Sequence, residues 1–204
     1  MGMSEEVFCL LQTMDRKRIE LQIVLQCAPT IAGLKPSNFL IVPRDQEEKV
    51  RLVMRYTGLY SYRLVYDRHR VIFLVFNKQM LSDYLSQEEV KAFLRDYGYG
   101  DNAFGYSLRN FQERYSKFVR TRKDFPHEAG IFLGYPLCDV KGFISRGGED
   151  YRASGYWKVY GDTENTMKLF EKFDDVKDEM VCMLSEGNSL HEIIETQSNL
   201  MKVS

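Results

Sequence analysis

Residues 62–77 have the sequence YRLVYDRHRVIFLVFN, and they decide the fold class of this chain. Residues 62–66 and 71–77 are rich in β-branched and aromatic side chains, which are typical of strands. The polar residues 67–70 between them have the composition of a tight connection. The stretch therefore predicts two strands that form an antiparallel hairpin.

Helix signals lie on both sides of this hairpin. The Ser-x-x-Glu pattern at 86–89 is a capping box, which predicts a helix over 86–97. Apolar residues at helical spacing predict a helix over 107–119, and a polar cap at 162–163 begins a long helix over 164–184. Further segments with helix or strand patterns are 4–26 with a break near 13–15, 47–56, 127–133, 137–146 and 189 onward for helices, and 38–42 and 155–160 for strands. We therefore expect an α+β fold that is mostly helical, with helices packed around a small antiparallel sheet.

Length and composition indicate one globular domain. The chain has 204 residues, of which 44 % are hydrophobic and 28 % charged. These values are close to the averages of globular proteins, and the length suits one domain of ordinary size. We expect a single domain over 1–196, followed by a frayed tail over 197–204.

Charge and hydropathy exclude several classes of protein. Lys and Arg total 28 against 29 Asp and Glu, a net charge of −1, so nothing global indicates a nucleic-acid or membrane partner. The clearest apolar run, 71–76, is too short to span a bilayer. Acidic residues precede the apolar residues at the start of the chain, which is the reverse of a secretory signal. We therefore expect a cytoplasmic protein with no membrane or nucleic-acid partner.

Four cysteines occur, and no two of them form a C-x-x-C pair. In a chain of this length the wide spacing predicts neither a disulfide framework nor a structural zinc site. Reduced thiols are the expectation, which agrees with a cytoplasmic location. The cysteines are Cys9, Cys27, Cys138 and Cys182.

Two segments combine polar residues with the glycines and prolines that fix backbone shape. Residues 27–38 are CAPTIAGLKPSN, and residues 125–136 are FPHEAGIFLGYP. Two shorter motifs follow, DVKGFI at 139–144 and GYWKVYGD at 155–162. Polar residues inside otherwise apolar stretches often mark functional sites, because function can require residues that folding alone does not favour.

On these motifs the chain resembles a family of uncharacterised proteins, a domain of unknown function found mainly in anaerobic Gram-positive bacteria. The resemblance extends from about residue 20 to 190, and the motif at 125–136 is the most specific part. It implies a cytoplasmic bacterial protein from a reducing environment. It implies no particular activity.

The first functional hypothesis is a small-molecule site built from the Cys27 and His127 segments. Aromatic side chains with a lysine suit a small anionic or planar ligand. If 155–160 is a strand, however, Trp157 and Lys158 point to opposite faces and do not both face one ligand. The candidate ligand-binding residues are Lys35, Asn38, Tyr135, Tyr156, Trp157 and Lys158.

The alternative hypothesis is a thiol-dependent enzyme. Cys27 would be the nucleophile and His127 its base, with Glu128 or Asp139 orienting the imidazole. A new helix that starts near Pro29 would place the sulfur at a helix N-terminus, which lowers a thiol pKa.

A further alternative is metal or haem binding by Cys27, His127 and Glu128, whose donor atoms suit iron or zinc. The zinc-protease pattern H-E-x-x-H is incomplete, because Ile131 stands at its second histidine. Adjacent residues on a helix also point about 100° apart, so joint ligation needs a loop.

The basic residues at 114–123 leave open one more function, that of an adaptor protein that binds an acidic partner. The sequence assigns no cofactor and no oligomeric state.

Overall fold

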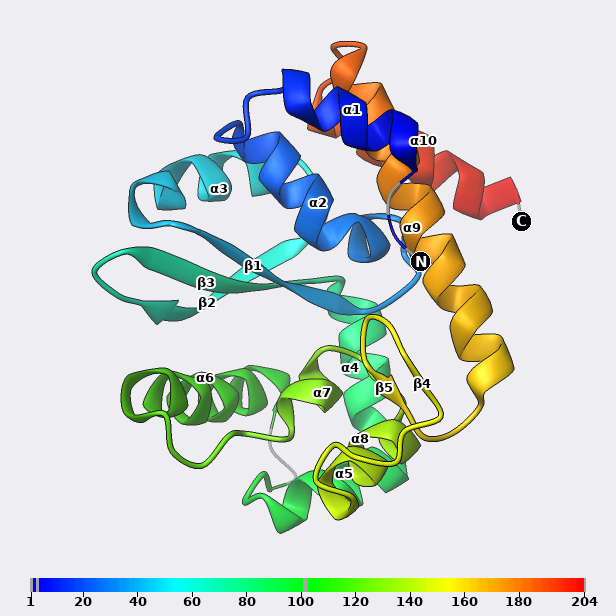
Figure 1. Ribbon diagram of the computed structural model, residues 1–204. Coiled ribbons are helices and arrows are strands. Elements are labelled where there is room, and N and C mark those ends of the chain that lie inside the picture. Colours follow the sequence, from blue (N-terminus) through cyan, green and yellow to red (C-terminus); the bar gives the residue numbers. More distant parts are fainter. Residues whose placement is uncertain (1, 3, 101–102, 204) are drawn as a thin grey trace.

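The computed structural model describes residues 2, 4–100 and 103–203, with the backbone alone for residues 198–203 (Figure 1). Its centre is a three-stranded antiparallel sheet in the order β1–β3–β2. The strands are β1 (Ser37–Pro43), β2 (Tyr60–Tyr66) and β3 (Arg70–Phe76). The hairpin predicted from residues 62–77 is therefore present, and its second strand lies in the middle of the sheet.

The remaining elements are mostly helical. In chain order they are α1 (Glu5–Thr13), α2 (Ile19–Ile31), the 3-10 helix Arg44–Gln46, α3 (Glu47–Met54), α4 (Lys78–Ser86), α5 (Glu88–Asp96), α6 (Phe104–Thr121), α7 (Ala129–Phe132), α8 (Leu137–Ser145), β4 (Ala153–Ser154), β5 (Lys158–Val159), α9 (Thr163–Ser185) and α10 (Leu190–Val203). Strands β4 and β5 pair as a separate antiparallel hairpin. The α+β class, mostly helical with a small antiparallel sheet, is confirmed.

Strand β3 is apolar from Val71 to Phe76 because both faces of the sheet are covered. Phe73 packs into a core with α2, whereas Leu74 packs into a second core with α6. The neighbouring strand follows the same alternation, since Leu40 pairs with Phe73 and Phe39 pairs with Leu74. A continuous apolar run is the pattern expected of a strand buried on both faces.

The sheet divides the molecule into two layers (Figure 1). Helices α1, α2, α3, α9 and α10 lie on one side, where α2 packs against β1 and α9. Helices α4, α5, α6, α7 and α8 lie on the other side, together with the β4–β5 hairpin. Helix α9 returns from that hairpin to the first layer, and its N-cap Asp162 accepts the amide of Asn165 at 3.1 Å. The core around α2 and the core around α6 therefore lie on opposite faces of the sheet.

A third apolar cluster joins the hairpin to α9. Trp157 and Val159 pack with Phe170 and Phe173 of α9. The Trp157 indole meets the Phe170 ring edge to face, with centroids 4.5 Å apart. This cluster fixes the hairpin against the long helix, so residues 153–160 form one wall of the space beside α7 and α8.

Several boundaries differ from the sequence predictions. Of the segment predicted as one strand over 155–160, only Lys158–Val159 is strand, and it pairs with Ala153–Ser154 just before the segment. Helix α2 continues through Pro29 to Ile31, because buried side chains such as Ile23 and Ile31 keep its face packed despite the lost backbone donor. Helix α10 runs to Val203, through most of the predicted tail, and residue 204 lies outside the described residues. The domain extent of 1–196 stays a prediction.

Within the described ranges, each helix is too short or too polar to cross a membrane.

Candidate functional site

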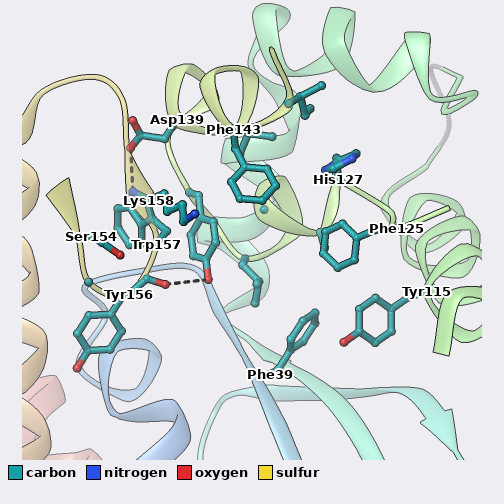
Figure 2. Close-up of a pocket in the computed structure, with 17 residues that line it drawn as sticks. Phe39, Tyr115, Phe125, His127, Asp139, Phe143, Ser154, Tyr156, Trp157 and Lys158 are labelled. Atoms are coloured by element: carbon teal, nitrogen blue, oxygen red, sulfur yellow. Dashed lines mark hydrogen bonds between the residues drawn. The ribbon is translucent and has the colours of Figure 1, made fainter. Parts of the chain in front are cut away.

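The molecule has a pocket of about 370 Å³ beside α7 and α8 (Figure 2). The hairpin forms one wall, and residues of β1 and α6 form the opposite wall. Most of the lining is aromatic or aliphatic. The lining residues are Phe39, Tyr115, Phe125, His127, Ala129, Gly130, Leu133, Tyr135, Asp139, Val140, Phe143, Ile144, Ser154, Gly155, Tyr156, Trp157 and Lys158.

Aromatic rings give the pocket flat walls. Tyr135 stacks on Trp157, with ring centroids 4.7 Å apart and planes 25° from parallel. On the other side, the His127 ring lies 5.3 Å from Phe125 and 5.9 Å from Phe143, between centroids. The rings come from segments distant in sequence, and Figure 2 shows them surrounding one space. Such walls suit a flat, largely apolar molecule.

Asp139 holds the tryptophan of this wall in place. Its Oδ2 accepts the Trp157 Nε1–H at 2.8 Å, and its Oδ1 accepts the backbone amides of Tyr160 at 2.7 Å and Gly161 at 2.8 Å. The carboxylate is buried in the first turn of α8. Asp139 therefore orients an indole and a backbone turn, whereas the sequence hypothesis had it orienting the His127 imidazole.

His127 lines the pocket and has one buried polar atom without a partner. Its Nδ1 is buried and has no hydrogen-bond partner among the described residues. The residue lies in the turn just before α7, so the helix begins two residues later than the sequence predicted. A buried nitrogen without a partner costs free energy unless a ligand or water satisfies it.

Glu128, the neighbour of His127, does not line the pocket. Its side chain is fully buried elsewhere, where it accepts the Tyr99 hydroxyl at 3.2 Å and pairs with Arg114. Burial and this carboxylate raise the pKa of Tyr99. The side chains of His127 and Glu128 therefore lie in different parts of the molecule. Glu128 is buried in the layer that contains α6.

Lys158 and Trp157 both line the pocket, because the argument that they face opposite sides applies only to a continuous strand over 155–160. The hairpin is short, and Trp157 lies before β5 and not within a continuous strand. The Lys158 ammonium donates to the Gly148 carbonyl and lies 4.7 Å from the Tyr151 ring centroid. Tyr156 contributes to the lining as well, but its hydroxyl bonds to Asp174 of α9 at 2.8 Å.

Cys27 lies in the other layer, in the core between α2 and the sheet. The residue is fully buried, and burial raises the pKa of its thiol to about 12, although the Lys35 cation opposes this. Its place in the last two turns of α2, away from the helix N-terminus, removes the dipole effect invoked for a thiolate. Cys27 is therefore a neutral thiol at physiological pH and is not brought together with His127.

Lys35 and Asn38 lie behind the pocket. Lys35 is buried, burial lowers its pKa to about 8, and its ammonium lies 5.1 Å from the Tyr135 ring centroid. The Asn38 Oδ1 accepts the Thr30 hydroxyl at 2.7 Å. Neither residue lines the pocket. Their contacts point to a supporting role for the first segment.

The two sequence segments nevertheless meet, through residues other than Cys27 and His127. Pro36 packs on Gly134, and the Ser37 hydroxyl donates to the Phe132 carbonyl. Gly134 has φ +73°, and a Cβ there would overlap the Pro36 ring. The first segment thus fixes the backbone that carries Tyr135 into the pocket.

Within the described residues, no three His, Cys, Asp or Glu side chains gather as a metal site. Cys27, His127 and Glu128 lie in three different surroundings: the α2 core, the pocket and the α6 layer. The geometry therefore gives no support to joint metal or haem ligation by these residues.

Sequence reasoning missed the opposite wall of the pocket. Phe39 and Tyr115 were assigned only to a strand and to a helix stripe, and Phe125 and Phe143 belonged to motifs without a role. Phe125 is 47 % exposed and Phe143 is 36 % exposed. The signal available in the sequence was the position of both phenylalanines in the motifs at 125–136 and 139–144, and their exposure is known only from the structure.

The fold and the pocket define a mostly helical α+β protein with an aromatic-lined pocket beside its sheet. Residues 23–194 match the family described as "Protein of unknown function (DUF3793)", and the chain belongs to that family. The resemblance to an uncharacterised family is confirmed at this level. Comparisons with curated proteins and with solved structures give no match.

Proposed function

We propose that this protein binds a small, planar, largely apolar molecule in the pocket between His127 and Trp157. One observation carries the proposal: aromatic rings from separate segments, the His127 and Trp157 rings among them, surround a space of about 370 Å³. Pockets of this size with few polar groups are typical of small-molecule sites.

Binding without chemistry is the better-supported reading. The carboxylate at the pocket, Asp139, already accepts three hydrogen bonds. The sequence's candidate nucleophile, Cys27, is a buried neutral thiol in the other layer. A thiol-dependent reaction needs its nucleophile within reach of the substrate, and Cys27 does not line the pocket.

The cellular setting proposed with this function is a bacterial cytoplasm. All four cysteines are free, which supports a reducing compartment. The motifs at 27–38 and 125–136 support the bacterial assignment through their resemblance. The partner proposed is a small molecule, with neither nucleic acid nor membrane, because the chain's charge is nearly balanced.

The test uses N-phenyl-1-naphthylamine, a neutral planar fluorophore, and energy transfer from Trp157, the single tryptophan of the chain. We expect saturable binding at one site with quenching of the Trp157 emission. The double variant Phe125→Ala/Phe143→Ala should weaken affinity about tenfold, because it removes two aromatic walls.

Phe8→Ala is the matched control for these substitutions. Phe8 is a similarly exposed phenylalanine, at 55 %, on α1 and outside the pocket. Its loss should leave the affinity unchanged. Equal binding by the double variant and by the control would overturn the proposal, and so would saturation without quenching of Trp157.

A further inference from the structure

The ammonium of Lys158 is a cation without a counter-ion at the pocket wall. Its hydrogen bond goes to the neutral Gly148 carbonyl, and the Tyr151 and Phe143 rings lie at 4.7 Å and 6.0 Å from it to the centroid. Among the described residues, no carboxylate oxygen lies within 4.0 Å of the Lys158 ammonium nitrogen, so the ammonium forms no salt bridge. Two of its three protons therefore remain available.

The pocket has no free acid to balance this charge. Asp139 is the single acidic residue among those that line it, and both of its oxygens are occupied by donors of the hairpin. Glu149 and Asp150 are close in sequence, but they are exposed and do not pair with Lys158. The formal charges of Lys158 and Asp139 cancel, but the Asp139 oxygens are turned to the hairpin, so the Lys158 ammonium is the charged group with free hydrogen-bonding capacity at the wall.

The segment of chain around Lys158 also has a positive net charge. Residues 114–158, which supply most of the pocket, contain nine Lys and Arg against five Asp and Glu. Two of those five acids, Glu128 and Asp139, are buried and engaged. The segment has a net charge of +4 in a chain with a net charge of −1. This field attracts anions toward the pocket.

We infer that the pocket selects a planar aromatic monoanion, such as a carboxylate or a sulfonate, whose acidic group pairs with Lys158 while its rings lie between the aromatic walls. The inference rests on the proposed function and names its ligand class. A neutral ligand would leave the ammonium desolvated without a partner. A dianion such as a phosphate monoester would bring a second charge that the apolar walls cannot compensate.

The test compares two probes that differ in one acidic group. 1-Anilinonaphthalene-8-sulfonate carries a sulfonate on the anilinonaphthalene frame, and N-phenyl-1-naphthylamine carries none. Titrations of the wild-type chain, followed by quenching of Trp157, should give the sulfonate at least tenfold tighter binding. A charge-assisted hydrogen bond has this magnitude. This comparison needs no variant, so it is independent of any folding defect.

Variants at Lys158 locate the selectivity. Lys158→Met keeps the aliphatic stem and removes the charge, and it should weaken binding of the sulfonate about tenfold while the neutral probe binds as before. Lys158→Arg should bind the sulfonate with an affinity within about threefold of the wild type, because the positive charge remains. Lys141→Met is the control, since Lys141 is exposed on α8 and does not line the pocket.

The outcomes separate the two proposals. If the neutral probe binds at Trp157 as tightly as the sulfonate, or if Lys158→Met affects both probes equally, the anion selectivity is wrong while the pocket still binds planar molecules. If neither probe quenches Trp157, the proposed function itself fails. If Lys141→Met reduces sulfonate binding as much as Lys158→Met does, general surface charge is responsible and the assignment to Lys158 is overturned.

Discussion

The Asp139 carboxylate and the Trp157 indole form a buried hydrogen bond of 2.8 Å that joins the first turn of α8 to the β4–β5 hairpin. The second carboxylate oxygen accepts the amides of Tyr160 and Gly161. One side chain thereby satisfies three donors, and the bonds to Trp157 and Tyr160 are buried. The same contact aligns the indole with the Tyr135 ring in the pocket wall.

Asp139→Asn should destabilise the protein by about 2 kcal/mol, because an amide places N–H donors against the donors that the carboxylate accepts. The Trp157 emission should also shift to the red as the indole becomes hydrated. Urea unfolding followed by circular dichroism measures the stability, and fluorescence measures the shift. Asp175→Asn, at an exposed position of α9, is the control and should change neither.

The fold class follows from patterns within single segments. The β-branched and aromatic residues at 62–66 and 71–77 predict a hairpin, and its second strand is the central strand of the sheet. Helix α6 was predicted from its apolar stripe, and α9 from the polar residues that cap it. These signals are local, so one sequence is enough to detect them.

The pocket could not be predicted in the same way. Phe39, Phe125 and Trp157 meet only because the sheet, α7 and the hairpin are folded around them. Cys27 shows the opposite error, since its position next to Pro29 indicated a helix start. Packing of α2 against the sheet carries the helix through the proline and buries the thiol. Tertiary contacts decide both cases, and sequence spacing does not report them.

Cys27 should resist alkylation in the native protein at pH 8. Burial raises the pKa of its thiol to about 12, so both the thiolate and the access needed for reaction are missing. Cys9 is exposed and is the internal reference. Iodoacetamide labelling mapped by mass spectrometry should show Cys9 modified at least about a hundredfold faster, in line with a thiol protected by global unfolding. Rapid labelling of Cys27 that slows in His127→Ala would restore the thiol-enzyme hypothesis.

Lys35 should make the protein more stable as the pH rises from about 8 to 10.5. Burial lowers its pKa from 10.5 to about 8 in the folded state, so the unfolded chain binds more protons than the native state across this window. Stability then increases with pH, and the burial cost of the ammonium is present in full below pH 8. Lys35→Met removes the titration, so the stability of the wild type minus that of the variant should rise by up to about 3 kcal/mol.

The Cys27 thiol has the opposite effect at high pH and must be separated from that of Lys35. Its pKa is raised from 9.0 to about 12, so above pH 9 the unfolded thiol ionises first and stability falls. Repeating the Lys35→Met comparison in a Cys27→Ala background removes this contribution. A difference that stays flat from pH 7 to 10 in that background contradicts the lowered Lys35 pKa.

Gly134→Ala should be among the most destabilising glycine substitutions in the chain. Gly134 has φ +73°, and an added Cβ would overlap the Pro36 ring, where the segments 27–38 and 125–136 meet. Gly58 separates the cost of the backbone conformation from the cost of the overlap with Pro36. It has φ +69° but nothing within 4 Å of an added Cβ. Gly58→Ala should cost about 1 kcal/mol from the backbone conformation alone. Gly134→Ala should cost about 2 kcal/mol more, because overpacking at a rigid proline adds to that cost. Equal losses in urea unfolding would mean that Pro36 moves aside without cost, and that the contact between the two segments does not fix the backbone before Tyr135.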